Sequence, residues 1–302
     1  MAEHVSYFYV IGSLSLELRL LSSDLTLDTS SGSYSFLTQE PHSGTADITI
    51  DYKISERIEP FAKDPVFVAE SFDDNMVPFK WYIYENDGVV FIEADLNDTF
   101  QIKKAVAKIC QKDKIEVVLY LRKGVKEIRF DPFFQPWGAI LLHYLAHENR
   151  GVLLHSSGVK DGEKGYVFTA VSGTGKSTMA ALWQSEGAQI INDDRLILMP
   201  QDAGVMMSNT PMPYYQDVYK ESPVTAVFLI KQSSNNYIKH LPGVAGVAGL
   251  MANCIQFLYD KKMVQKHLNS LTAIAERCPI YELGFKPDTE IVEFIRSEFR
   301  GK

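Results

Sequence analysis

The sequence contains few cysteines and no excess of positive charge. Its three cysteines, Cys110, Cys254 and Cys278, are widely spaced and form no C-x-x-C pair. This pattern excludes a disulfide framework and a cysteine-rich zinc module, and it fits a reducing cytoplasm. The net charge of -8 argues against a nucleic-acid partner, because phosphate backbones are bound by excess lysine and arginine.

Signals for export or membrane insertion are also missing. The N-terminal residues include no basic region followed by an apolar segment and a cleavage site. No segment reaches the ~18 uninterrupted apolar residues of a membrane-spanning helix. We therefore expect a cytoplasmic protein with no membrane partner. Its 302 residues, 46% of them hydrophobic, suffice for one large domain or two smaller ones.

The stretch AVSGTGKST at residues 170–178 is the most informative part of the sequence. Gly173 and Gly175 permit turns that a side chain would block, so that successive N–H groups can point at phosphate oxygens. In such a phosphate-binding loop, or Walker A motif, Lys176 is placed to bind the β- and γ-phosphates and Ser177 to ligate Mg²⁺. ATP or GTP is therefore the expected ligand. The residues expected to bind it are Ser172, Gly173, Thr174, Gly175, Lys176, Ser177 and Thr178.

The surroundings of this loop fit the same function. Residues 165–171 are typical of a short buried strand, and the residues after Lys176 favour a helix that Gly187 ends. A strand, a loop and a helix in this order are the context that the motif requires, although Ala170 replaces glycine at its first position. The N-terminus of the helix would face the bound anion.

Two adjacent carboxylates, Asp193 and Asp194, end a predicted strand at residues 188–194. P-loop enzymes keep a carboxylate for Mg²⁺ or for the nucleophile at this place. Neighbouring strand residues point to opposite faces, so one carboxylate would hold the metal and the other would accept a proton from an attacking hydroxyl. The alternative interpretation is an acid pair that only ends a strand and begins a turn.

The sequence predicts a β-rich N-terminal module at residues 1–135 and an α/β domain around the phosphate-binding loop at residues 136–302. One helix, at residues 101–111, interrupts the first series of strands. The predicted strands lie at residues 7–14, 47–52, 81–84, 89–93, 116–122, 151–159, 195–199, 205–207, 226–230 and 280–283. The predicted helices of the second domain, besides the one after the loop, lie at residues 138–148, 243–259, 262–277 and 289–299.

His143 and His147 are spaced four residues apart in one of these helices. Two histidines at this spacing can hold a metal ion from one helix face. Tyr144 follows His143 where H-E-x-x-H has glutamate, and no third ligand is apparent in the sequence. We therefore interpret the pair as packing or surface histidines.

The second domain resembles the catalytic domain of HPr kinase/phosphorylase and its wider group of P-loop proteins. The segments that carry the resemblance are LLHSSGV with His155, VSGTGKS in the loop, and GAQIINDD with the acid pair, in the same order and spacing as in that family. Ser208-Asn-Thr-Pro211 is similar to a short segment that follows the acid pair there. The chain is more similar to the HPr-kinase-like branch that includes lasso-peptide kinases than to HPr kinase proper.

This resemblance implies a P-loop kinase fold and a role for each matching residue. Lys176 would bind phosphate, Ser177 and Asp193 would be on the metal side, and Asp194 would be the general base toward a serine hydroxyl. His155 matches an active-site histidine near the transferring phosphate. An ordinary strand-end histidine is the alternative for His155.

The sequence also departs from the family. Thr178 stands where HPr kinases have glutamate, and the family's E-I-R-G-L-G signature, which supplies a second metal carboxylate, is missing. Asp217 or Glu221 are candidates for that carboxylate. The resemblance does not extend to HPr as the acceptor or to phosphorylase activity.

The leading functional hypothesis is an ATP- and Mg²⁺-dependent phosphotransferase, a serine kinase whose partner is an acceptor protein or peptide. Two alternatives are a kinase for a small metabolite such as free serine and a non-catalytic nucleotide-binding sensor or scaffold. An exposed sheet edge in the N-terminal module is a hypothetical acceptor-binding surface. The family resemblance suggests a homo-oligomer.

Overall fold

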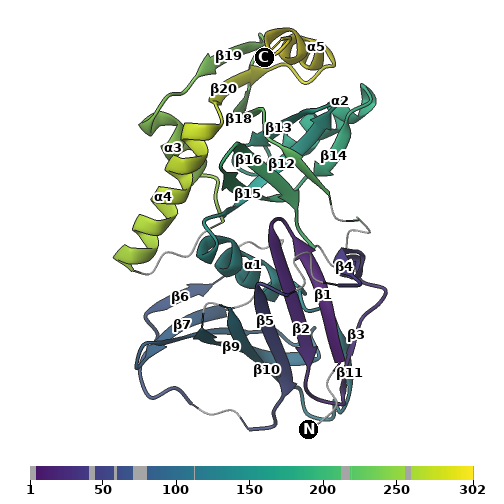
Figure 1. Cartoon of the computed structure of the whole chain (residues 1–302), viewed down its shortest axis with the longest axis vertical. Helices are drawn as coiled ribbons and strands as arrows, with labels where there is room; N and C mark the ends of the chain where they lie inside the picture. Colours follow the sequence, from purple (N-terminus) through teal and green to yellow (C-terminus); the bar gives the residue numbers. More distant parts are fainter. Residues whose placement is uncertain are drawn as a thin grey trace. The chain divides into compact units, whose positions relative to one another are not determined.

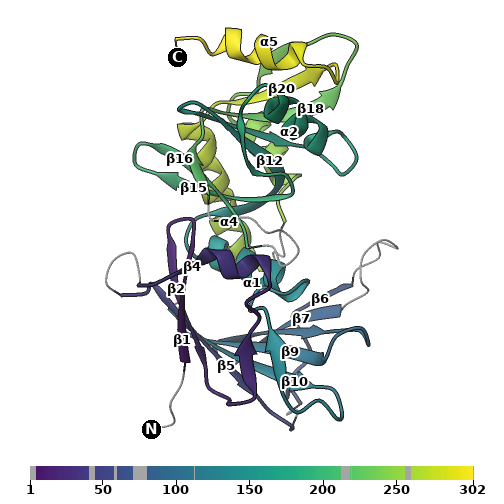
Figure 2. The same cartoon turned by 90° about the vertical axis from the view of Figure 1, so that its right-hand side faces the viewer.

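The computed structural model describes residues 5–40, 45–57, 60–70, 80–111, 113–211, 218, 220–255 and 260–301. The chain divides into two compact units, Met1–Leu141 with Pro211–Val218 and Leu142–Thr210 with Tyr219–Lys302. Figure 1 labels most of their helices and strands, and Figure 2 shows them from a second side. The fold is of the mixed α/β class. The domain boundary expected between residues 135 and 136 stays a prediction.

The first unit contains a mixed sheet of nine strands in its described residues, with the order β4-β1-β2-β5-β10-β9-β8-β7-β6. Parallel pairing joins β5 to β2 and β10, and the other neighbours are antiparallel. A separate parallel pair is formed by β3 (Leu25–Leu27) and β11 (Ile128–Phe130), and a 3₁₀ helix covers Gly32–Phe36. The nine strands are β1 (Val5–Ile11), β2 (Leu14–Leu20), β4 (Leu37–Thr38), β5 (Ile48–Ile54), β6 (Phe67–Glu70), β7 (Lys80–Asn86), β8 (Val89–Asp95), β9 (Ile102–Gln111) and β10 (Lys114–Leu121).

The helix predicted at residues 101–111 is wrong, because this segment is strand β9. Residue Lys103 is an extra residue in the pairing, since Leu121 pairs with Ile102 and Tyr120 with Lys104. This bulge puts Ile102 and Ala105, both buried, three residues apart on the same face of the sheet. The spacing therefore imitates a helical period in a strand.

The second unit has its own sheet, with the order β17-β16-β15-β12-β13-β18-β20-β19 and with β14 paired to β12. The central strands β13, β18 and β20 are parallel. The long strand β12 pairs with β13, β14 and β15. Its strands are β12 (Val152–Asp161), β13 (Lys164–Thr169), β14 (Gln189–Asn192), β15 (Arg195–Gln201), β16 (Gly204–Asn209), β17 (Glu221–Pro223), β18 (Ala226–Gln232), β19 (Tyr237–His240) and β20 (Ile280–Phe285).

Helices cover both faces of this second sheet. Helices α2 and α5 pack on one face through a cluster that contains Trp183 and Ile295, and α3 and α4 pack on the other face through Leu250 and Leu271. The helices are α1 (Trp137–Glu148), α2 (Lys176–Ser185), α3 (Val244–Met251), α4 (Lys261–Arg277) and α5 (Glu290–Glu298). The helix expected at residues 243–259 ends at Met251, and residues 256–259 lie outside the described residues. Among the helices that the structure describes, none combines the length and the apolar character needed to cross a membrane.

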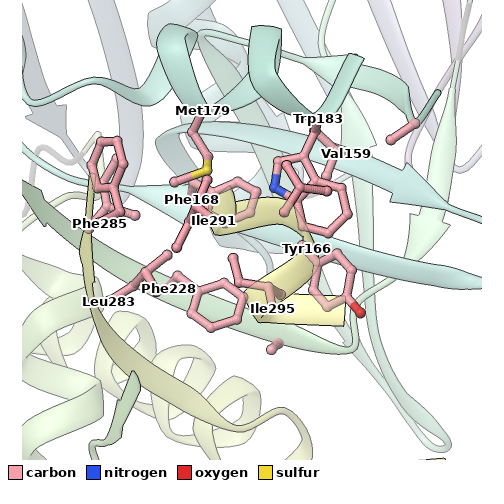
Figure 3. Close-up of a cluster of buried hydrophobic side chains, with 14 of the residues drawn as sticks. Val159, Tyr166, Phe168, Met179, Trp183, Phe228, Leu283, Phe285, Ile291 and Ile295 are labelled. Atoms are coloured by element: carbon pink, nitrogen blue, oxygen red, sulfur yellow. The ribbon is translucent and has the colours of Figure 1, made fainter. Parts of the chain in front are cut away.

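Aromatic side chains form the centre of the α2 and α5 face (Figure 3). Phe228 stacks on Phe168 with ring centroids 5.4 Å apart. The ring centroid of Tyr281 lies 5.7 Å from that of Phe228. Met179 and Trp183 reach this cluster from α2 and are fully buried. These contacts fix the first turns of α2 against the strand that precedes it.

We expect Phe228→Ala to lower the free energy of unfolding by about 3–5 kcal/mol, because it leaves a cavity among buried rings. Val244→Ala is the control, since Val244 is 86% exposed and its loss should change stability by less than about 0.5 kcal/mol. Chemical unfolding followed by circular dichroism measures both. Equal effects of the two variants would contradict the packing described.

Candidate functional site

Residues 170–175 connect β13 to α2 and have the backbone that the glycine pattern predicts. Gly173 has φ +79° and Gly175 has φ +117°, and both values lie in the region that favours glycine. A Cβ atom on Gly175 would lie 3.0 Å from Cζ of Phe285, so β20 also limits the size of this residue. The strand, loop and helix around the motif are confirmed.

The N-terminus of α2 has no side-chain cap. Its first backbone hydrogen bond runs from the amide of Met179 to the carbonyl of Gly175, at 2.9 Å. Within the described residues, the N–H groups of residues 175–178 donate to no protein acceptor. Unpaired amides at the positive end of a helix dipole form a site for an anion.

Lys176 lies under the loop and is 6% exposed. Its Nζ donates to the carbonyls of Ala170 at 3.0 Å and Val171 at 3.3 Å, while its own carbonyl accepts from the Ser157 hydroxyl at 3.0 Å. Burial lowers the pKa of Lys176, and the negative charge of Asp194 opposes that change. The ammonium group is therefore held near both the loop and an aspartate.

The other predicted loop residues lie toward solvent. Ser172, Gly173, Ser177 and Thr178 are exposed, and the Thr174 hydroxyl donates to the Val171 carbonyl at 2.9 Å. These positions leave the amides and hydroxyl groups of the loop accessible to a ligand.

His155 of β12 and Asp194 are brought together; the strand expected at residues 188–194 ends at Asn192, so the acid pair lies in the turn between β14 and β15. His155 Nε2 lies 3.5 Å from Asp194 Oδ1, within ion-pair range but longer than a good hydrogen bond. The Ser156 amide donates to the Asp194 carbonyl at 3.0 Å, and the Thr169 hydroxyl donates to the His155 carbonyl at 2.9 Å. The first bond ties the acid to β12, and the second ties the histidine to β13, the strand that leads into the loop.

Several charges act on His155. Burial and the positive charge of Lys176 lower its pKa, Asp194 opposes this, and Arg195 adds to the lowering. A lowered pKa favours the neutral form of the His155 ring. A neutral imidazole in this place can accept a proton or a hydrogen bond.

Asn192 and Arg195, which flank the acid pair, contact Asp194, and neither was singled out as a site residue from the sequence. The Asn192 side-chain carbonyl accepts from the amides of Asp194 at 2.8 Å and Arg195 at 2.9 Å. Arg195 Nε lies 3.5 Å from Asp194 Oδ2. The run Asn-Asp-Asp-Arg carried the signal, because an asparagine that bonds amides two and three residues later is typical of a tight turn.

Asp193 is half-buried, and its carboxylate has no hydrogen-bond or ion-pair partner in the described part of the chain. Glu221 lies exposed on β17, and Asp217 lies outside the described residues. Near the loop, the described ranges contain no group of three histidine, cysteine or acidic side chains that could hold a metal ion by themselves. A Mg²⁺ ion that takes most of its ligands from phosphate and water does not need such a group.

The residues present fit a nucleotide with Mg²⁺. The open amides of residues 175–178 and the ammonium of Lys176 suit phosphate oxygens. The Ser177 hydroxyl and the unpaired Asp193 carboxylate suit a hard cation. Their roles stay predictions.

Neither the protein-family models nor the curated proteins contain a match to this sequence. One solved structure to which the chain is similar is the Hpr(Ser) kinase/phosphatase from Coxiella burnetii. The identity is 10%, the match covers 49% of this chain and 99% of that chain, and the TM-score is 0.32. Since this TM-score is low, the functional argument depends on the loop, the acid pair and their geometry.

We expect Gly175→Ala to weaken ATP binding about tenfold or more, because alanine is strained at φ +117° and would press on Phe285. Gly162→Ala is the matched control. Gly162 also has a positive φ, +60°, but it lies in the turn between β12 and β13 with nothing within 4 Å of an added Cβ. Calorimetric titration with ATP distinguishes them, and an equal loss of affinity would mean that Gly175 has no special role.

The charges around His155 predict the direction in which its pKa changes in two variants. Asp194→Asn removes the charge that raises the pKa and should lower it further, whereas Lys176→Met should raise it. NMR titration of the His155 ring nitrogens measures the order: Asp194→Asn lowest, wild type between, Lys176→Met highest. The reverse order would contradict the arrangement of the three side chains.

Proposed function

We propose that this chain is an ATP- and Mg²⁺-dependent kinase that transfers the γ-phosphoryl group to a serine hydroxyl of a protein or peptide. The observation that carries the proposal is the open N-terminus of α2, with Lys176 buried beneath it and Asp194 close enough to affect the pKa of Lys176. A phosphate cradle next to a carboxylate supplies the two elements of phosphoryl transfer, charge neutralisation and activation of the acceptor.

The binding step depends on the loop. The amides of residues 175–178 and the Lys176 ammonium neutralise negative charge on the phosphates. Ser177 and Asp193 are the proposed metal-side residues. When bound, Mg²⁺ supplies charge neutralisation between the phosphates and orients them.

Asp194 is the proposed general base. Its carboxylate lies 3.5 Å from both His155 Nε2 and Arg195 Nε, so two neighbours fix its orientation. The carboxylate accepts the proton of the acceptor hydroxyl as the oxygen attacks phosphorus. His155 is the proposed neighbour of the transferring phosphate, where its neutral ring donates or accepts a hydrogen bond.

The exposure of the loop favours a macromolecular acceptor over a small metabolite. Val171, at the beginning of the loop, is 70% exposed, and Ser172, Gly173 and Ser177 are also exposed. An apolar side chain beside an open phosphate site provides a contact for an approaching polypeptide. A kinase for free serine would instead be expected to enclose its substrate.

We expect Asp194→Asn to lower the rate of phosphoryl transfer about 10²- to 10⁴-fold while ATP affinity stays nearly unchanged, because the base is lost and the cradle is kept. Lys176→Met should lower transfer about 10²- to 10³-fold. Transfer of label from γ-labelled ATP to serine-containing peptides and proteins measures both. Asp202→Asn, in the exposed turn between β15 and β16, is the control.

The same assay separates the alternatives. Label on free serine but on no peptide would overturn the proposed acceptor class. ATP binding without transfer to any acceptor would identify a nucleotide sensor or scaffold instead of a kinase. Normal transfer by Lys176→Met would show that the loop is not the site of catalysis.

A further inference from the structure

Three histidines meet inside the second unit. His143 and His147 of α1 lie beside His267 of α4, and all three side chains are buried, with 1%, 1% and 0% exposure. The ring centroids are 6.0 Å apart for His143 and His147, 6.4 Å for His143 and His267, and 6.1 Å for His147 and His267. The structure thus supplies the third histidine that the sequence did not reveal.

The hydrogen bonds of the cluster leave coordinating nitrogens available. His147 Nε2 lies 3.2 Å from the Met263 carbonyl, and Nδ1, which lies 3.5 Å from a Glu148 carboxylate oxygen, is the ring nitrogen left to face a cation. The backbone of Ile255 is close enough to act on the His143 ring. Metal-binding histidines ordinarily donate their second ring N–H to a carbonyl or carboxylate in this way.

His267 provides the strongest sign of a ligand. Neither of its ring nitrogens has a protein partner in the described residues, although the side chain is fully buried. A buried polar group without a partner is costly.

We propose that His143, His147 and His267 form a binding site for a zinc-like divalent transition-metal ion that joins α1 to α4. The fourth position would be held by water or by Glu148, whose carboxylate lies 3.5 Å from His147 Nδ1 and 2.8 Å from Lys266. Imidazole ligands select Zn²⁺ and similar ions over Mg²⁺. This site is separate from the nucleotide site.

The ring centroids are close enough to share one ion, but the rings must turn to face it, because the planes of His147 and His267 are only 18° apart. A triangle with the three observed sides has its centre about 3.6 Å from each ring centroid, whereas a zinc–nitrogen bond of about 2.0–2.1 Å puts the metal about 3.2 Å from a ring centroid. The nitrogens do not yet converge, as the described residues contain no preformed metal group. Ring rotation and an approach of about 0.4 Å per ring would close the site.

The test uses the full chain after treatment with a chelator, in saturating Mg²⁺ and ATP so that the nucleotide site is occupied. Zn²⁺ binding is measured by competition with a chromophoric chelator, and Co²⁺ is added in parallel for its ligand-field absorption spectrum. We expect the chain to bind one equivalent of Zn²⁺ tightly, and the absorption spectrum of bound Co²⁺ to be that of a four-coordinate ion. The midpoint of thermal unfolding should be several degrees higher with Zn²⁺ than without it.

His267→Gln should weaken Zn²⁺ binding at least about 100-fold and abolish the Co²⁺ spectrum. His240→Gln, an exposed histidine on β19, is the matched control and should bind like wild type. Circular dichroism checks that each variant is folded, and His143→Gln is the second variant if His267→Gln is not. Absence of tight binding in wild type, or unchanged binding in a folded cluster variant, would overturn the proposal.

Discussion

The open N-terminus of α2 is the constraint on which the second unit depends. The first amides of the helix have no partners in the described residues, while Met179 and Trp183 of the same helix are fully buried against the sheet. A helix that lacks a cap loses about 0.5–2 kcal/mol relative to one with a good cap. The aromatic cluster beneath α2 stabilises this arrangement, so the helix end stays exposed for a ligand and does not fray.

Strand β12 brings the remaining parts of the candidate site to this helix. It pairs with β13, which leads into the loop, and with β14 and β15, which flank the turn that carries Asp193 and Asp194. His155 lies within β12, in the part that pairs with β15. One long strand therefore sets the distance between the phosphate loop, the acid pair and the histidine, and main-chain hydrogen bonds hold that distance.

Local signals were predictable from the sequence, and long-range contacts were not. The loop, the strand before it and the helix after it were predicted because glycine positions and apolar periods act over a few residues. Strand β9 was mistaken for a helix because the bulge at Lys103 depends on its partner β10. His267 was missed as a neighbour of His143 because 124 residues of sequence separate the two rings, which meet only when α4 packs beside α1.

The electrostatics of the site explain why the loop suits an anion. Burial disfavours the charge on Lys176 and lowers the pKa of His155, and Asp194 compensates only in part. A phosphate group near the α2 amides would add negative charge close to both side chains and favour their protonated forms. The cationic groups are thus held in a poorly solvated place, where a bound anion would contribute the missing compensation and where the attraction between these groups and a phosphate oxygen would be stronger than in water.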